Sequence, residues 1–171
     1  MDWYKINFDG ASKGNPRIAG CGIIIRDAYG EKVGCMAIPI GIQTNHVVEA
    51  SVALYGLIYA KSLNLKKVWL EGDSLDIINF LNKITKPSWT ISNIICQTID
   101  IINSFGICVV THNFREVKWV VDWVANMAYE SEEKVIWNNN DLIPIEGCPL
   151  IKHDKMGRKK MCSINDDHVQ K

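Results

Sequence analysis

Four acidic residues that lie far apart in the sequence are the first candidates for chemistry. They are Asp9, Glu49, Asp73 and Asp122, separated by 40, 24 and 49 residues. Like charges repel, so four carboxylates at one place are costly unless cations lie between them. No Cys or imidazole stands among the four, and a hard oxygen ligand set favours Mg²⁺ or Mn²⁺ over zinc or copper. Two such ions about 4 Å apart could bind a phosphodiester, one activating water and the other stabilising the leaving oxygen.

The first of these carboxylates follows a predicted strand. Tyr4, Ile6 and Phe8 alternate with polar residues, a period of two that indicates a β-strand ending on Asp9. The small residues 10–12 come next and would let a phosphate approach the backbone. Taken alone, Asp9 could equally cap a turn, as Asp often does. Its role as a metal ligand therefore depends on where the other carboxylates lie.

The strands and helices predicted for the rest of the chain determine where the other carboxylates lie. Short links join the first three strands and helical segments precede each later strand, so the order βββαβααβα predicts an α/β fold. The expected sheet is mixed, five-stranded and flanked by helices. Pro39 marks the end of its strand or an edge. Hydrophobic periodicity and turn residues predict further strands at 19–26, 32–40, 67–73 and 107–112, and helices at 46–63, 75–83, 92–105 and 117–129.

This topology places all four carboxylates at one edge of the sheet. Asp9 and Asp73 end parallel strands, and the helices that carry Glu49 and Asp122 begin at the same edge. Open α/β sheets usually bind ligands there. His112 ends the last strand, where it could shuttle a proton or serve as a structural histidine.

The charge balance excludes binding to nucleic acid through a global positive field. The chain has 19 Lys and Arg against 19 Asp and Glu, so any such binding must come from local patches or bound metal. None of the six cysteines forms a CxxC pair, which favours a reducing compartment. The start lacks the apolar core of a signal peptide, and no apolar run reaches membrane-spanning length. We expect an intracellular protein, cytoplasmic or nuclear, without membrane association and monomeric.

Five segments carry a resemblance to a known family. They are residues 8–16, 20–27, 44–50, 72–74, and 112–116 running to 121–125. Over residues 3–130 the chain resembles the type 1 ribonuclease H family, and within it the reverse-transcriptase-like domains of plant non-LTR retrotransposons. The resemblance implies a ribonuclease H-like fold with strand order 3-2-1-4-5. It also implies cleavage within the RNA strand of RNA–DNA hybrids, leaving 3′-hydroxyl and 5′-phosphate ends. The implied cofactor is Mg²⁺, two ions with substrate, with Mn²⁺ as an alternative.

The same resemblance assigns site residues. The four acidic residues match the metal-binding carboxylates, and His112 matches the mobile catalytic histidine. The segment before Glu49 would contact RNA 2′-hydroxyls, which is how such a site chooses RNA over DNA. The positions that match segments near nucleic acid are Gly10, Ala11, Ser12, Lys13, Asn15, Thr44, Asn45, His46 and Ser74.

Three residues depart from the family pattern. Arg17 replaces a glycine, His46 replaces an amide side chain, and Lys118 replaces an asparagine one turn before Asp122. A cation at Lys118 could pair with that carboxylate and compete with metal. The chain also lacks the extra basic helix that some members use to hold the hybrid. These departures predict reduced rate or affinity. They leave open a non-catalytic module that binds nucleic acid or a protein partner, or a retrotransposon remnant.

Residues 131–171 lose hydrophobic periodicity. This loss of periodicity predicts an irregular or disordered tail, which follows a domain at residues 1–130. Trp89 could stack on nucleic acid, but the simpler expectation is that it packs.

Overall fold

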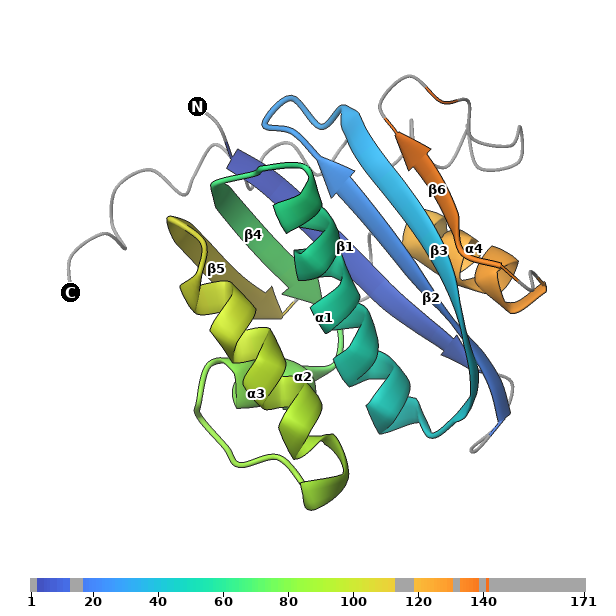
Figure 1. Cartoon of the computed structure of the whole chain (residues 1–171), viewed down its shortest axis with the longest axis vertical. Helices are drawn as coiled ribbons and strands as arrows, with labels where there is room; N and C mark the ends of the chain where they lie inside the picture. Colours follow the sequence, from blue (N-terminus) through green and yellow to red (C-terminus); the bar gives the residue numbers. More distant parts are fainter. Residues whose placement is uncertain (1–2, 13–16, 113–118, 131–132, 139–140, 142–171) are drawn as a thin grey trace.

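A mixed β-sheet forms the centre of the computed structural model (Figure 1). The structure describes residues 3–12, 17–112, 119–130, 133–138 and 141. The strands of this part are β1 (Trp3–Ser12), β2 (Arg17–Arg26), β3 (Lys32–Gln43), β4 (Lys67–Gly72), β5 (Ile107–His112) and β6 (Val135–Asn138). Its helices are α1 (Asn45–Ser62), α2 (Leu75–Leu81), α3 (Trp89–Asn103) and α4 (Trp119–Glu130). None of these helices is long and apolar enough to cross a membrane.

The predicted sheet topology is confirmed, and one strand is added to it. β1 pairs antiparallel with β2 and parallel with β4, β4 pairs parallel with β5, and the full order is β5-β4-β1-β2-β3-β6. β6 lies in the segment predicted to be irregular. It pairs with Gly34–Ala37 of β3 and buries Trp137. Four residues are too few for a periodic signal, so long-range pairing rather than local pattern produces this strand.

Pro39 lies on an edge, as one of its two interpretations predicted. β6 stops opposite Ala37, and beyond that residue the described strands give β3 no outer partner. Proline has no N–H to donate, so an edge position costs no ladder hydrogen bond. The strand nevertheless continues to Gln43 instead of ending at about residue 40.

The first strand does not end on Asp9. It runs on to Ser12, which pairs with Ala19. β2 begins earlier than predicted, at Arg17, and supplies backbone partners for the small residues after the carboxylate. Asp9 therefore lies inside a strand, opposite Gly22.

Three helices begin at other residues than expected. α1 begins at Asn45, one residue before the predicted start. α3 begins at Trp89, three residues before the predicted start. α4 begins at Trp119, so Asp122 lies in its first turn rather than its second.

Alternation along the strands divides side chains between two faces of the sheet. On β1, Ile6 and Phe8 face the larger core, whose other members include residues of α1 and α3. Asp9 therefore points to the opposite face, on which α4 packs. Figure 1 shows α1 and α3 in front of the sheet and α4 behind it. The smaller core on the α4 side consists of Ile24, Cys35, Ala37, Val121, Val124, Ala128 and Trp137.

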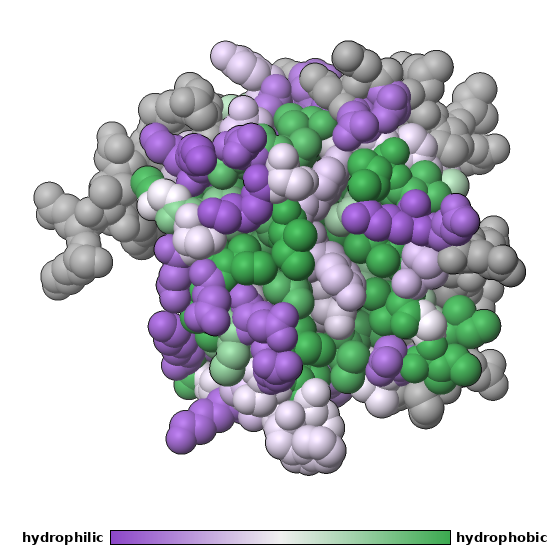
Figure 2. Space-filling model, in the orientation of Figure 1, coloured by the Kyte–Doolittle hydropathy of each residue, from purple (hydrophilic) through white to green (hydrophobic). Residues whose placement is uncertain are grey.

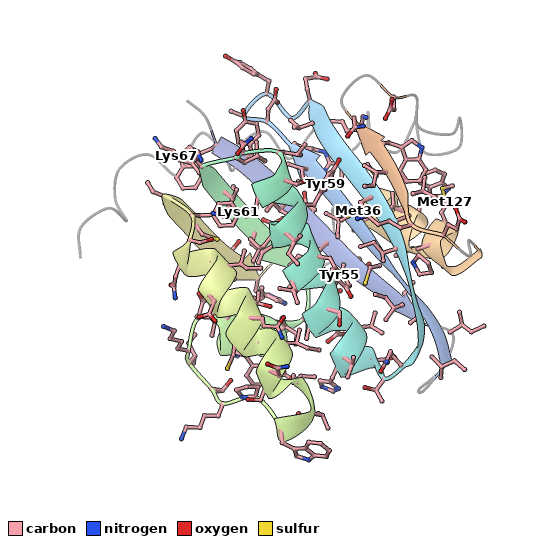
Figure 3. All side chains as sticks on the ribbon, viewed as in Figure 1. Met36, Tyr55, Tyr59, Lys61, Lys67 and Met127 are labelled. Carbon is pink, nitrogen blue, oxygen red and sulfur yellow. The ribbon has the colours of Figure 1, made fainter. Side chains whose placement is uncertain are left out.

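A groove of about 360 Å³ lies between α1 and the β3–β6 edge. Figure 3 shows Met36, Tyr55 and Tyr59 there, and Figure 2 shows apolar side chains gathered over the same elements. The Tyr59 hydroxyl is buried without a hydrogen-bond partner among the described residues. None of the described residues that line this groove is acidic, and the lining includes none of the four predicted carboxylates.

We expect the free energy of unfolding to fall as the pH rises above about 9. Burial raises the pKa of the Cys35 thiol from 9.0 to about 12, and that of Tyr59 from 10.0 to about 12. The folded protein keeps these protons while the unfolded chain releases them. Their contribution is therefore fully present below the unfolded pKa values and lost as the pH climbs through the folded ones.

Urea unfolding midpoints measured at about pH 8 and about pH 11 check this expectation. The double variant Cys35→Ala/Tyr59→Phe lacks both groups and should lose less stability over the same range. Equal losses in the variant and the wild type would contradict the assignment.

Candidate active site

Strand register brings three of the predicted residues to one end of the sheet. β1 and β4 run parallel and pair up to Asn7 and Glu71, so Asp9 and Asp73 each lie two residues beyond this last pair. Asp9 lies inside β1, whereas Asp73 follows β4, which ends at Gly72 and not at residue 73 as predicted. His112, the last residue of β5, pairs with the last residue of β4, next to Asp73. The predicted edge is therefore built by β1, β4 and β5 together.

His112 contacts the backbone of Asp73. Its Nε2 lies 2.9 Å from the Asp73 carbonyl oxygen. A carbonyl only accepts hydrogen bonds, so Nε2 donates in this contact and carries the hydrogen. The half-buried ring is thus held beside the predicted metal ligands, and its proton-transfer role stays a prediction.

α4 brings Asp122 close to Asp9 through a tight helix–strand contact. Gly22 pairs with Asp9 and has no side chain. A Cβ placed on Gly22 would overlap the Val121 carbonyl oxygen and lie 2.6 Å from the Ala125 amide nitrogen. The first turns of α4 therefore lie directly on β2 beside Asp9. Asp122 is exposed, so a cation from solvent can reach its carboxylate.

Glu49 reaches the same region from α1. It is the fifth residue of the helix, and its neighbour Val48 packs against Gly10 of β1. Ser74 occupies the N-cap position of α2, yet its hydroxyl makes no cap. Instead Ser74 Oγ donates a hydrogen bond to Glu49 Oε2 at 2.7 Å. This bond joins Glu49 to the loop that carries Asp73, a role for Ser74 that sequence reasoning missed.

The carboxylates suit a hard divalent cation by donor type and by location. Within the ranges the structure describes, however, no three His, Cys, Asp or Glu side chains are gathered closely enough to hold one ion. The residues therefore fit a metal site whose side chains must rotate to enclose an ion.

The positions predicted to contact nucleic acid are only partly described. Gly10, Ala11 and Ser12 form the end of β1. Thr44, Asn45 and His46 are exposed at the start of α1, where Thr44 makes no side-chain cap. His46 Nε2 lies 4.0 Å from Asp76 Oδ2, and both side chains are exposed, so this pair adds little stability. Lys13, Asn15 and Lys118 lie outside the described residues, and Arg17 begins β2.

Trp89 does not pack as expected, because 89% of its surface is exposed. α3 buries Ile91, Ile95 and Thr98. Trp89 precedes Ile91 by two residues, and this offset turns it to the opposite side of a helix with 3.6 residues per turn. The offset between Trp89 and Ile91 therefore indicates that Trp89 is exposed, but only when the start of the helix at residue 89 is known.

Comparison with known proteins agrees with this geometry. Residues 7–128 match the family described as Reverse transcriptase-like. An Arabidopsis thaliana protein named "Putative ribonuclease H protein" is 30% identical over 157 residues, which cover 92% of this chain and 25% of the relative. The chain thus spans about a quarter of the length of that protein.

Two solved structures share the fold over most of their length. RNase H1 from the halophilic archaeon Halobacterium salinarum is 25% identical with a TM-score of 0.72, and the match covers 75% of this chain and 98% of that one. LC11-RNase H1 in complex with an RNA/DNA hybrid is 25% identical with a TM-score of 0.70, covering 74% and 96%. With the sheet order, the placed carboxylates and these matches together, the chain belongs to the reverse transcriptase-like family of ribonuclease H domains.

Proposed function

We propose that this protein is a divalent-metal-dependent endonuclease that hydrolyses the RNA strand of RNA–DNA hybrids, leaving 3′-hydroxyl and 5′-phosphate ends. The observation that carries the proposal is the placement of Asp9, Glu49, Asp73 and Asp122, from four separate parts of the fold, around one end of the sheet. Family membership and the likeness to ribonucleases H, one of them solved with a hybrid, support a ribonuclease H-like nuclease.

In this proposal the four carboxylates would bind two Mg²⁺ ions when substrate is present. Mn²⁺ could take the place of Mg²⁺. The cations would supply Lewis-acid stabilisation of the phosphate and a more acidic water. Asp9 lies inside a paired strand, which is a rigid support for a metal ligand. Asp122 lies on an exposed turn of a helix. Ser74 orients Glu49 through its hydroxyl.

Proton transfer is assigned to His112. With Nε2 donating to the Asp73 carbonyl, Nδ1 is the basic nitrogen of the neutral ring. Imidazole side chains act as general acids and bases in proteins, and in this role His112 would pass a proton to the leaving oxygen.

Substrate contacts are assigned to the residues that flank the carboxylates. Thr44, Asn45 and His46 are exposed where α1 begins and would contact the RNA 2′-hydroxyls. Gly10, Ala11 and Ser12 would lie near the backbone of the nucleic acid. We further propose that the protein acts as a monomer in the cytoplasm or nucleus.

Incubation of the purified protein with an end-labelled RNA–DNA hybrid and Mg²⁺ tests this function. We expect internal cuts in the RNA strand, none in RNA or DNA duplexes, and none after addition of EDTA. Intact hybrid in both Mg²⁺ and Mn²⁺ would overturn the activity. Cleavage that persists in EDTA would overturn the metal dependence.

A non-catalytic module that binds nucleic acid or a protein partner is the second candidate. Within the described ranges it is favoured by Arg17, which begins β2 where the family pattern has a glycine. Lys118, outside those ranges, would add to it by pairing with Asp122. Hybrid binding without turnover, together with metal affinity restored by Lys118→Asn, would support this candidate.

Ser74→Ala is expected to slow hybrid cleavage about tenfold. A hydrogen bond to a charged group contributes about 1.5–3 kcal/mol, and its loss frees Glu49 to leave the site. Single-turnover cleavage rates measure the effect. Ser74→Thr keeps a hydroxyl and should stay close to wild type, and an equally slow threonine variant would argue against a role through Glu49.

A further inference from the structure

Three glycines next to the predicted metal ligands are points of close approach between elements. The first is Gly10, which follows Asp9 in β1. A Cβ placed there would lie 2.6 Å from Val48 Cγ1 and 3.7 Å from the Glu49 amide nitrogen. Val48 is 1% exposed and β-branched, so within its helix it has one strongly preferred rotamer and little room to turn away. The absence of a side chain at Gly10 therefore sets how near α1, and with it Glu49, lies to β1.

The second is Gly72, which precedes Asp73. A Cβ there would overlap the Phe8 ring, lying 2.7 Å from Cε1 and 2.8 Å from Cε2. Phe8 is 3% exposed and lies in the larger core, where close packing leaves no space for the ring to retreat. Gly72 thus sets the distance between the part of β1 that carries Asp9 and the end of β4 that precedes Asp73.

The third is Gly22, on which α4 lies. A Cβ at Gly22 would meet backbone atoms rather than a side chain. It would overlap the Val121 carbonyl oxygen and lie 2.6 Å from the Ala125 amide nitrogen. Backbone cannot rotate away, so any side chain at Gly22 must lift the helix. That helix turn carries Asp122.

We propose that Gly10, Gly22 and Gly72 are positioning residues that together set the spacing of the four metal-binding carboxylates. Each carboxylate lies within one residue of a glycine contact: Asp9 beside Gly10, Glu49 beside Val48, Asp73 beside Gly72, and Asp122 beside Val121. The proposal rests on the proposed function, because it takes these carboxylates to be the metal ligands.

Alanine at each position gives a graded test. Displacing a catalytic group by about 1 Å can cost about 100-fold in rate, and disturbing the support of metal ligands about 10–100-fold in metal affinity. We expect Gly10→Ala, Gly22→Ala and Gly72→Ala each to lower Mn²⁺ affinity about tenfold, measured by calorimetry without substrate. Hybrid cleavage should fall about 100-fold.

Compensating changes separate positioning from general damage. Val48→Ala removes the methyl that Gly10→Ala would strike, so the double variant should recover most of the Mn²⁺ affinity. Phe8→Leu should likewise relieve Gly72→Ala. Ala125→Gly should not relieve Gly22→Ala, because the Val121 carbonyl remains in the way.

Gly34→Ala is the matched control. A Cβ there would overlap the Tyr59 hydroxyl, beside the α1 groove, so it should reduce stability while leaving Mn²⁺ affinity unchanged. Wild-type affinity in all three site variants would overturn the inference, as would no Mn²⁺ binding by the wild type. If the wild type binds Mn²⁺ but leaves the hybrid intact, the proposed function fails, and the calorimetric comparison still decides the glycine roles.

Discussion

Asp73→Asn is expected to slow cleavage of an RNA–DNA hybrid by about 1,000-fold or more, which corresponds to about 4 kcal/mol of transition-state stabilisation. Asparagine keeps the size of the side chain and removes its charge, so it binds a hard cation far more weakly. The backbone carbonyl that accepts from His112 is unchanged by the substitution. The loss should therefore come from the metal site and not from a rearranged fold.

Single-turnover rates at saturating protein measure the effect, and hybrid binding in Ca²⁺ should stay within about threefold of wild type. Asp100→Asn is the matched control, because Asp100 is an exposed carboxylate on α3 outside the predicted site. It should cleave at the wild-type rate. A variant at Asp73 that keeps more than about a tenth of wild-type activity would remove this carboxylate from the proposed chemistry.

The order of the five main strands followed from the sequence because its physical causes are local. Alternation marks β1, and two short links make β3 run in the same direction as β1. The helical segment between β3 and β4 then returns the chain, so that β4 runs parallel to β1. The last strand, Ile107–His112, agrees with its predicted bounds because an apolar run lies between Gly106 and the end of the β pattern. These features also place the acidic residues at the predicted edge.

The structural features that the sequence did not reveal depend on contacts between residues that are far apart in the chain. β6 exists through pairing with β3, and β1 continues past Asp9 because β2 extends with it. Ser74 has the local signature of a helix cap, but its hydroxyl binds Glu49, a residue 25 positions away. Local reasoning supplies positions, whereas these contacts arise only when the elements pack.

A buried polar network behind the site should be a sensitive point for stability. Lys5 Nζ lies 2.8 Å from Glu71 Oε1, and their side chains are only 11% and 3% exposed. Asn7 Nδ2 donates to the same oxygen at 3.1 Å, and Arg26 donates to Asn7 Oδ1 at 3.1 Å. Lys5 also lies 4.7 Å from the centre of the Trp69 ring. The network thus ties β2, β1 and β4 together on the face that carries Asp9.

Glu71→Ala is expected to lower the free energy of unfolding by roughly 3–5 kcal/mol, because it leaves the buried Lys5 ammonium without this carboxylate. Urea unfolding at neutral pH measures the change. Replacing both members, as in Lys5→Met/Glu71→Leu, should cost much less, since an apolar pair of similar volume needs no desolvated charge. If the double variant is as unstable as Glu71→Ala, the loss comes from the Asn7 hydrogen bond or from packing. In that case the ion pair does not govern the stability of this face.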